Sequence, residues 1–106
     1  FQSEIDAENN ANKQGFSAGI LDTLSAQYIR VTPQKNAVDI NGRAVFYCAA
    51  NSKNDTSFNV QSNASNMIGI PQNILKPGKY QVKLRWKSSK FLNQEFLNKF
   101  EYTLNK

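Results

Sequence analysis

The sequence predicts a mainly β protein, a seven-stranded β-sandwich that follows a short N-terminal helix. Residues 79–87 alternate polar and apolar side chains without interruption, which is typical of a strand with one buried and one solvated face. Further short strand-like stretches recur along the chain, and turn-forming residues separate them. Helix-like sequence is confined to the first fourteen residues.

The length and composition indicate one domain. The chain has 106 residues, enough for a single modest core. It carries 13 Lys and Arg against 8 Asp and Glu, a net charge of +5 that is scattered along the chain. Such a charge favours acidic partners or anionic surfaces, and we expect no nucleic-acid binding. We therefore divide the chain into a polar helix at residues 1–15 and a β-sandwich domain at residues 16–106.

The N-terminal residues have the features of a helix. Acidic residues lie near its start, Lys13 lies near its end, and Gly15 occupies a position where helices commonly stop. Few side chains here are apolar, so we expect burial to anchor this helix weakly. Two interpretations stay open: a solvated surface helix, or a stalk that continues from a membrane helix upstream of Phe1.

The strands are expected at residues 16–23, 26–32, 43–50, 57–62, 66–70, 79–87 and 95–104. In the second strand, Ile29 and Val31 should face the core. Residues 44–50 are apolar on both faces, which predicts a central strand that is covered on both sides. In the last strand, Asn98 falls on the face that is otherwise apolar, and a β-bulge would explain it.

The strand at residues 79–87 also supplies the candidate site. Its buried face should hold Tyr80, Val82, Leu84 and Trp86. Its opposite face places a row of cations, which we consider a possible partner-contact face: Lys79, Lys83, Arg85 and Lys87. This row is either a solvated sheet face that Glu95 and Glu101 partly balance, or a surface for an acidic partner or anionic headgroups.

The chain offers little reactive chemistry. It contains no His, which is the commonest general base and a common metal ligand. Cys48 and Met67 are the only soft ligands that Cu(I) would favour, and they fall on separate predicted strands. We expect Cys48 to be a small core residue, with a reactive or intermolecularly bonded thiol and a metal ligand as the alternatives. The sequence therefore predicts no enzyme activity, no metal site and no cofactor.

One segment resembles a feature of immunoglobulin-like sandwiches. Leu75-Lys76-Pro77-Gly78-Lys79-Tyr80-Gln81-Val82 is similar to the corner before strand F, where a tyrosine hydroxyl bonds to the backbone upstream. The resemblance implies an immunoglobulin-like arrangement of the strands and a hydrogen bond from Tyr80 to the preceding backbone.

A second resemblance spans nearly the whole chain, and three segments carry it. The polar helix at residues 1–11 is one, and Asn41-Gly42-Arg43-Ala44-Val45-Phe46-Tyr47 is the second. The third runs from Ile70-Pro71 to Leu75 and continues through Gly78-Lys79-Tyr80-Gln81-Val82-Lys83-Leu84-Arg85-Trp86. Together they resemble the extracytoplasmic part of the FixH family, in the form found in Bacteroidetes-type bacteria.

This resemblance implies a membrane-anchored accessory protein without enzyme activity. It places the domain on the periplasmic side of the cytoplasmic membrane, behind a single-pass anchor. The implied partners are membrane proteins, either assembly factors of the cbb3-type cytochrome oxidase or a copper-type cation-transporting ATPase. The alternative is a secreted β-sandwich module that binds a small ligand or a glycan.

Overall fold

The fold is known from a computed structural model, which describes residues 2–32, 39–62, 67–71, 73–91 and 93–104. The expected boundaries at Phe1 and Asn66 lie outside these residues. The described elements are the helix α1 (Gln2–Gln14), a short 3-10 helix at Ser52–Asn54, and the strands β1 (Ser17–Asp22), β2 (Gln27–Thr32), β3 (Ile40–Cys48), β4 (Thr56–Ser62), β5 (Met67–Gly69), β6 (Gly78–Lys87) and β7 (Phe96–Leu104). The protein is therefore mainly β, as the sequence predicts.

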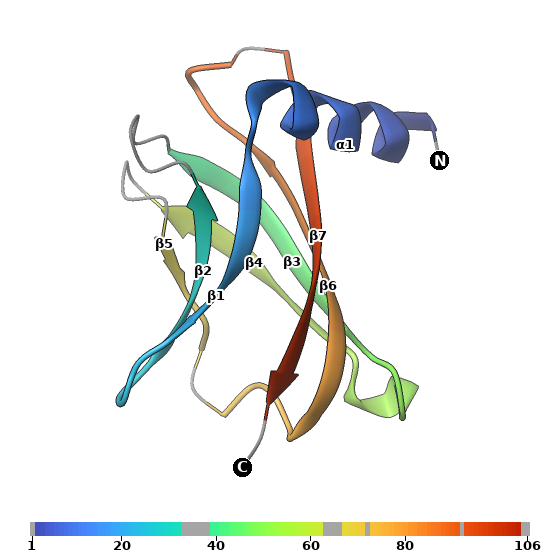
Figure 1. The fold of residues 1–106 in the computed structure, drawn as a ribbon, viewed down its shortest axis with the longest axis vertical. Coiled ribbons are helices and arrows are strands. Elements are labelled where there is room, and N and C mark those ends of the chain that lie inside the picture. Colours follow the sequence, from blue (N-terminus) through green and yellow to red (C-terminus); the bar gives the residue numbers. More distant parts are fainter. Residues whose placement is uncertain (1, 33–38, 63–66, 72, 92, 105–106) are drawn as a thin grey trace.

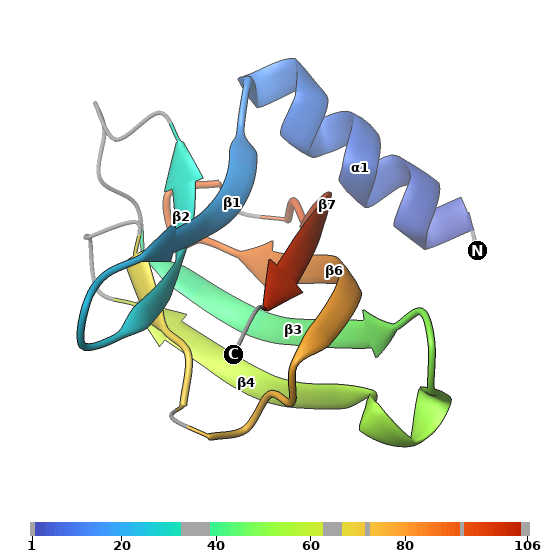
Figure 2. The same cartoon turned by 60° about the horizontal axis from the view of Figure 1, so that its bottom comes forward.

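The strands form two antiparallel sheets. A three-stranded sheet has the order β1-β2-β5, and a four-stranded sheet has the order β4-β3-β6-β7. The sheets face each other, and α1 lies near one end of β7 (Figure 1). Figure 2 shows α1 on the side of the four-stranded sheet that faces away from β1 and β2.

The core fills the space between the two sheets. The predicted inward residues Ile29 and Val31 are fully buried in β2. The predicted inward row of β6 is also confirmed, because Tyr80, Val82, Leu84 and Trp86 are each at most 1% exposed. The alternation of residues 79–87 therefore has the cause that the sequence suggested, a strand with one face in the core.

Asn98 belongs to the core without a bulge. The pairing of β6 with β7 runs without interruption from Gly78 opposite Leu104 to Trp86 opposite Phe96, so the suggested bulge is wrong. The Trp86 Nε1–H donates to Asn98 Oδ1 at 3.0 Å, and Asn98 Nδ2–H donates to the carbonyl oxygen of Phe16 at 3.0 Å. A polar side chain fits in the core here because its amide group provides a hydrogen-bond partner for both the buried indole N–H of Trp86 and the carbonyl oxygen of Phe16.

The segment before β6 forms the hydrogen bond that the corner resemblance implies. The Tyr80 hydroxyl donates to the carbonyl oxygen of Lys76 at 2.7 Å, which fixes the chain that leads into the strand. Burial is the main cause that raises the pKa of Tyr80 above its ordinary value.

Helix α1 ends where the sequence predicts. Gly15 has a φ of 75°, and its N–H and that of Phe16 bond to the carbonyls of Asn12 and Ala11. This is a Schellman end, in which glycine is favoured at the left-handed position. Ala7 and Ala11 are at most 1% exposed, so two of the few apolar side chains of the helix pack on the sheet. Small side chains let the helix backbone lie close to β7, where Leu97 is buried on the same outer face.

Strand β3 is central in its sheet but is not covered on both sides. Its inward residues are buried, whereas outward Tyr47 is 42% exposed and Val45 is half-buried. The prediction of two-sided coverage is therefore wrong, because α1 packs over β7 and leaves the outer side of β3 accessible. No helix among the described residues is both long and apolar enough to cross a membrane.

Candidate functional site

The candidate cations lie in one row on the outer face of β6. Lys79 and Lys87 stand at the two ends of the strand and are exposed. Lys83 and Arg85 lie in the middle and are half-buried. We call this outer surface of β3, β6 and β7, together with the first turn of α1, the outer face.

Lys83 sits in a cluster that the helix completes. It lies directly opposite Lys99 on β7, and two like charges in this position repel each other. The Glu4 carboxylate of α1 lies 2.9 Å from Lys83 Nζ and 3.6 Å from Lys99 Nζ, and Glu8 adds a contact of 3.7 Å to Lys99. The bond to Lys83 lowers the pKa of Glu4, and the same bond raises the pKa of Lys83. The helix therefore neutralises a repulsive pair on the sheet.

Arg85 is bonded both to Glu95, just before β7, and to Ser3 of α1. Its Nη2 lies 2.7 Å from the Glu95 carboxylate and donates to Ser3 Oγ at 3.0 Å. The expected balance by Glu95 is confirmed, and the bond between these groups raises the pKa of Arg85. Glu101 lies opposite Gln81 and forms no ion pair within the described residues, so that part of the expectation is wrong.

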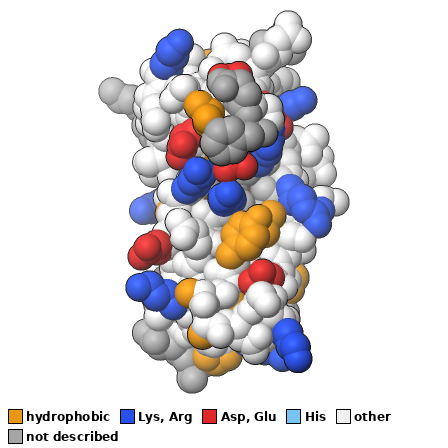
Figure 3. Space-filling model, turned by 90° about the vertical axis from the view of Figure 1, so that its right-hand side faces the viewer, with side chains coloured by type: hydrophobic (Ala, Val, Ile, Leu, Met, Phe, Trp, Pro, Cys, Tyr) orange, Lys and Arg blue, Asp and Glu red, His pale blue; other side chains and the backbone are white. Residues whose placement is uncertain are grey.

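Residues of β3 extend the outer face beyond the predicted row. Arg43 donates to Asn59 Oδ1 at 3.2 Å and to Ser57 Oγ at 2.6 Å. The Tyr47 ring lies 5.7 Å from Lys83 Nζ, within the range of a cation–π contact. Figure 3 shows the molecule from this side, where basic side chains flank an exposed hydrophobic patch.

A shallow hollow of about 180 Å³ lies at the centre of the outer face. Its lining combines cations, an acid and apolar side chains: Glu4, Arg43, Val45, Tyr47, Lys83, Arg85 and Leu97. Guanidinium groups and an exposed tyrosine suit carboxylates and planar groups of a partner. The lining contains no serine, threonine or cysteine side chain.

Sequence reasoning missed Glu4, Glu8, Arg43 and Tyr47 as members of this surface. A signal for the two acids exists, since they lie four residues apart and share one side of the helix. Ala7 and Ala11 have the same spacing and mark the neighbouring side that packs on the sheet. Nothing in the sequence, however, says which strand the helix covers.

Cys48 lies in the core, as expected. It is 8% exposed at the end of β3, opposite Tyr80. Met67 is on β5 in the other sheet. The described residues contain no cluster of three or more Cys, Asp or Glu side chains that could hold a metal ion.

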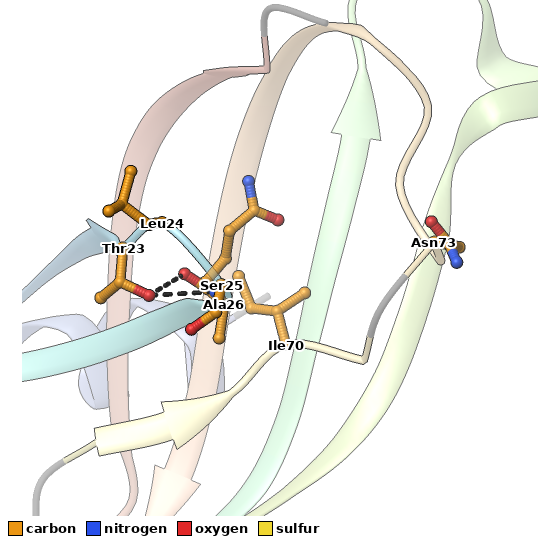
Figure 4. Close-up of a pocket in the computed structure, with 7 residues that line it drawn as sticks. Thr23, Leu24, Ser25, Ala26, Ile70 and Asn73 are labelled. Carbon is orange, nitrogen blue, oxygen red and sulfur yellow. Dashed lines mark hydrogen bonds between the residues drawn. The ribbon is translucent and has the colours of Figure 1, made fainter.

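A second hollow of about 290 Å³ lies at the turn between β1 and β2 (Figure 4). Its lining includes Leu24, which is completely exposed, and Ile70 and Asn73 from the segment after β5. Thr23 Oγ1 accepts from the Ala26 N–H at 3.0 Å and donates to the Ala26 carbonyl oxygen at 2.8 Å. The hydroxyl group is thus used to close the turn.

Comparison with known proteins gives no relative. The chain matches no protein-family model, no curated protein and no solved structure.

Proposed function

We propose that this chain is the protein-binding domain of a FixH-like accessory protein, without enzyme activity. In this proposal a single-pass anchor holds it on the periplasmic side of the cytoplasmic membrane. Its partners are membrane proteins that assemble the cbb3-type oxidase, or an associated cation-transporting ATPase. The proposal rests on the three segments that resemble the family, and the outer face supplies a surface for it.

The finer description of the fold belongs to the same proposal. We propose a seven-stranded immunoglobulin-like sandwich. The separation of β1, β2 and β5 from β4, β3, β6 and β7 supports it. The bond from the Tyr80 hydroxyl to Lys76, four residues upstream near the start of a central strand, supports it further.

The composition of the outer face is the observation that carries the binding role. Arg43 and Lys87 present charge on a surface that also exposes Tyr47, and interfaces are enriched in Arg and Tyr. The face is wide and only slightly hollowed, which suits a protein surface better than a small molecule. Its excess of cations favours an acidic partner.

Charge reversal on the outer face tests this role. The full-length protein carrying Arg43→Glu and Lys87→Glu is used for affinity capture from membranes, and captured proteins are identified. The matched control carries Arg30→Glu and Lys76→Glu, which make the same change of net charge at exposed positions, one on β2 of the other sheet and one in the segment between β5 and β6. We expect the first variant to lose its partners and to lower cbb3 oxidase levels in cells, and the control to retain both.

Two results would contradict the proposal. Partners retained by the outer-face variant would exclude the outer face as the binding surface. A deletion strain with normal cbb3 oxidase levels would exclude the assembly role, whatever the domain binds.

The hollow beside Leu24 favours the second candidate, a secreted module that binds a small ligand or a glycan. Amide chemical shifts measured against a panel of monosaccharides and oligosaccharides test it, and changes confined to residues 23–27 would support it. The sequence upstream of Phe1 in the full-length protein also separates the candidates. An apolar span of about 20 residues favours the anchored protein, and a cleavable signal favours the secreted one.

A further inference from the structure

The two open sides of the sandwich differ in how their edge strands are protected. On one side, β1 and β7 lie next to each other. The Tyr102 hydroxyl connects them by donating to Asp22 Oδ1 at 3.2 Å, and Asn98 of β7 bonds to the carbonyl of Phe16, just before β1. On the other side, the seven residues of β4 lie beside a β5 strand of only three residues. Within the described residues, β4 pairs with β3 alone.

Within Thr56–Ser62, strand β4 carries none of the side chains or irregularities that usually keep an edge from pairing. Natural edge strands carry charges, proline or bulges, which discourage contact with another strand. The sequence Thr56-Ser57-Phe58-Asn59-Val60-Gln61-Ser62 contains no charged residue and no proline. Its pairing with β3 runs without interruption from Ile40 opposite Ser62 to Phe46 opposite Thr56, so it has no bulge. By contrast, the other edge strand of this sheet, β7, carries Lys99 and Glu101.

The residues of β4 are arranged symmetrically about Asn59. An antiparallel pair of two β4 strands, centred on Asn59, places Phe58 opposite Val60 and Ser57 opposite Gln61 of the other copy. Phe58 and Val60 belong to the inner side, and Ser57, Asn59 and Gln61 belong to the outer side. Every opposed pair therefore matches apolar with apolar or polar with polar, as cross-strand pairing requires.

We infer that β4 pairs with β4 of a second copy of this chain, joining two four-stranded sheets into one sheet of eight strands. The occupant is a second copy because the side chains of β4 are themselves uncharged, so the same edge of another molecule meets no like charge on them, and the alternation of the strand keeps apolar side chains opposite apolar ones. Arg43 lies one strand inward, opposite Asn59. The two β3 strands would be three strand spacings apart, about 14 Å, but each Arg43 guanidinium reaches over β4 to Asn59 and Ser57. The two positive charges would therefore lie closer together than the β3 strands, and we expect the association to strengthen as added salt screens them. This inference is independent of the proposed membrane partners.

The dimer that this geometry predicts is weak. A single pair of edge strands buries less surface than a standard interface, so we expect association between roughly 10 µM and 1 mM. Analytical ultracentrifugation of the chain over that range measures it. Hydrogen exchange at the two ends of the range should show added protection of β4 amides at the high concentration, with the β7 amides unchanged.

Two variants that share one substitution test the register. Ser57→Glu with Gln61→Glu places like charges opposite each other at two positions of the pair. We expect the dissociation constant of the dimer to rise about tenfold. Ser57→Glu with Gln61→Lys places opposite charges there, and we expect association at least as strong as in the unchanged chain. In both variants a carboxylate at position 57 keeps an acceptor near Arg43, whose Nη2 donates to Ser57 in the unchanged chain. Thermal unfolding confirms that each is folded.

A control variant and the contradicting results complete the test. Gln81→Lys makes an exposed outer-face change on the central strand β6, and we expect it to leave association unchanged. An unchanged chain that stays monomeric at 1 mM would overturn the inference. So would equal association of the two double variants, or assemblies larger than a dimer.

Discussion

The two faces of the four-stranded sheet are stabilised by different forces. The inner face buries a continuous apolar layer, and the amide group of Asn98 within it has hydrogen-bond partners. The outer face holds long basic side chains, and the acids of α1 together with Glu95, just before β7, partly neutralise them. Burial of apolar area contributes far more per residue than partly exposed ion pairs do. The fold therefore depends on the inner face, and the outer face is freer to serve binding.

Gly42→Ala should reduce the stability of the fold most, because the paired strand β6 leaves no room for a Cβ atom at this position. A Cβ atom at Gly42 would overlap the carbonyl oxygen of Arg85 and lie 2.6 Å from Trp86 Cα. These are backbone atoms of the paired strand β6, so the two strands would have to separate. We expect a loss of about 3 kcal/mol in the free energy of unfolding, measured with urea. Gly19→Ala is the control, since nothing lies within 4 Å of its Cβ position, and we expect a change below about 0.5 kcal/mol.

Asn98→Leu should have the next largest effect. It leaves the Trp86 Nε1–H and the Phe16 carbonyl without their observed partner inside the core, and we expect a loss of about 2 kcal/mol in the free energy of unfolding. A double-mutant cycle isolates the cause. In a Trp86→Phe background the indole donor is gone, so Asn98→Leu should be less costly there. An equal cost in both backgrounds would show that the indole bond does not explain the buried amide.

Tyr102 gives a pH test of the contact between the sheets. Its hydroxyl bonds to Gln27 and Asp22, and burial is the first cause that raises its pKa to about 12. A raised phenol pKa means that between pH 10 and 12 the unfolded chain releases this proton and the folded chain keeps it. The contribution of Tyr102 is therefore complete below pH 10 and decreases as the pH rises toward 12. Tyr102→Phe should show a shallower fall in stability over this range, and identical pH profiles would contradict it.

The inner face was largely predictable from the sequence because its signal is local. Apolar residues of β6 recur at every second position, and a strand with one buried face imposes this spacing. The Tyr80 corner and the end of α1 at Gly15 were predictable for the same reason, since both depend on residues within six positions of each other. Asn98 was not explained, because its partners Trp86 and Phe16 lie 12 and 82 residues away.

The outer face was only half predictable. The cation row followed from alternation in β6, and Glu95 is close enough in sequence for its pairing with Arg85 to be expected. The contact of Lys83 with Glu4 joins residues 79 positions apart and depends on where α1 docks. Exposed Tyr47 was missed because a short apolar run does not reveal which of its faces is covered.

Glu4→Gln should have the smallest effect, and it tests whether the outer face is held by charge. Without the carboxylate, Lys83 and Lys99 remain opposed across the strands, so the first turn of α1 should loosen while Ala7 and Ala11 keep the rest in place. We expect the amides of residues 6–8, which bond to carbonyl groups of the first turn, to exchange about twofold faster at low salt, and 1 M NaCl to remove the difference. The lowered pKa of Glu4 means that its contribution is present above pH 4.5 and is lost as the pH falls through the lowered value, so the two proteins should converge in acid. Glu101→Gln, on the same face, is the control. A difference that persists in high salt would show that Glu4 acts through packing. Packing would then stabilise both faces of the sheet, and the faces would differ only in how much it contributes.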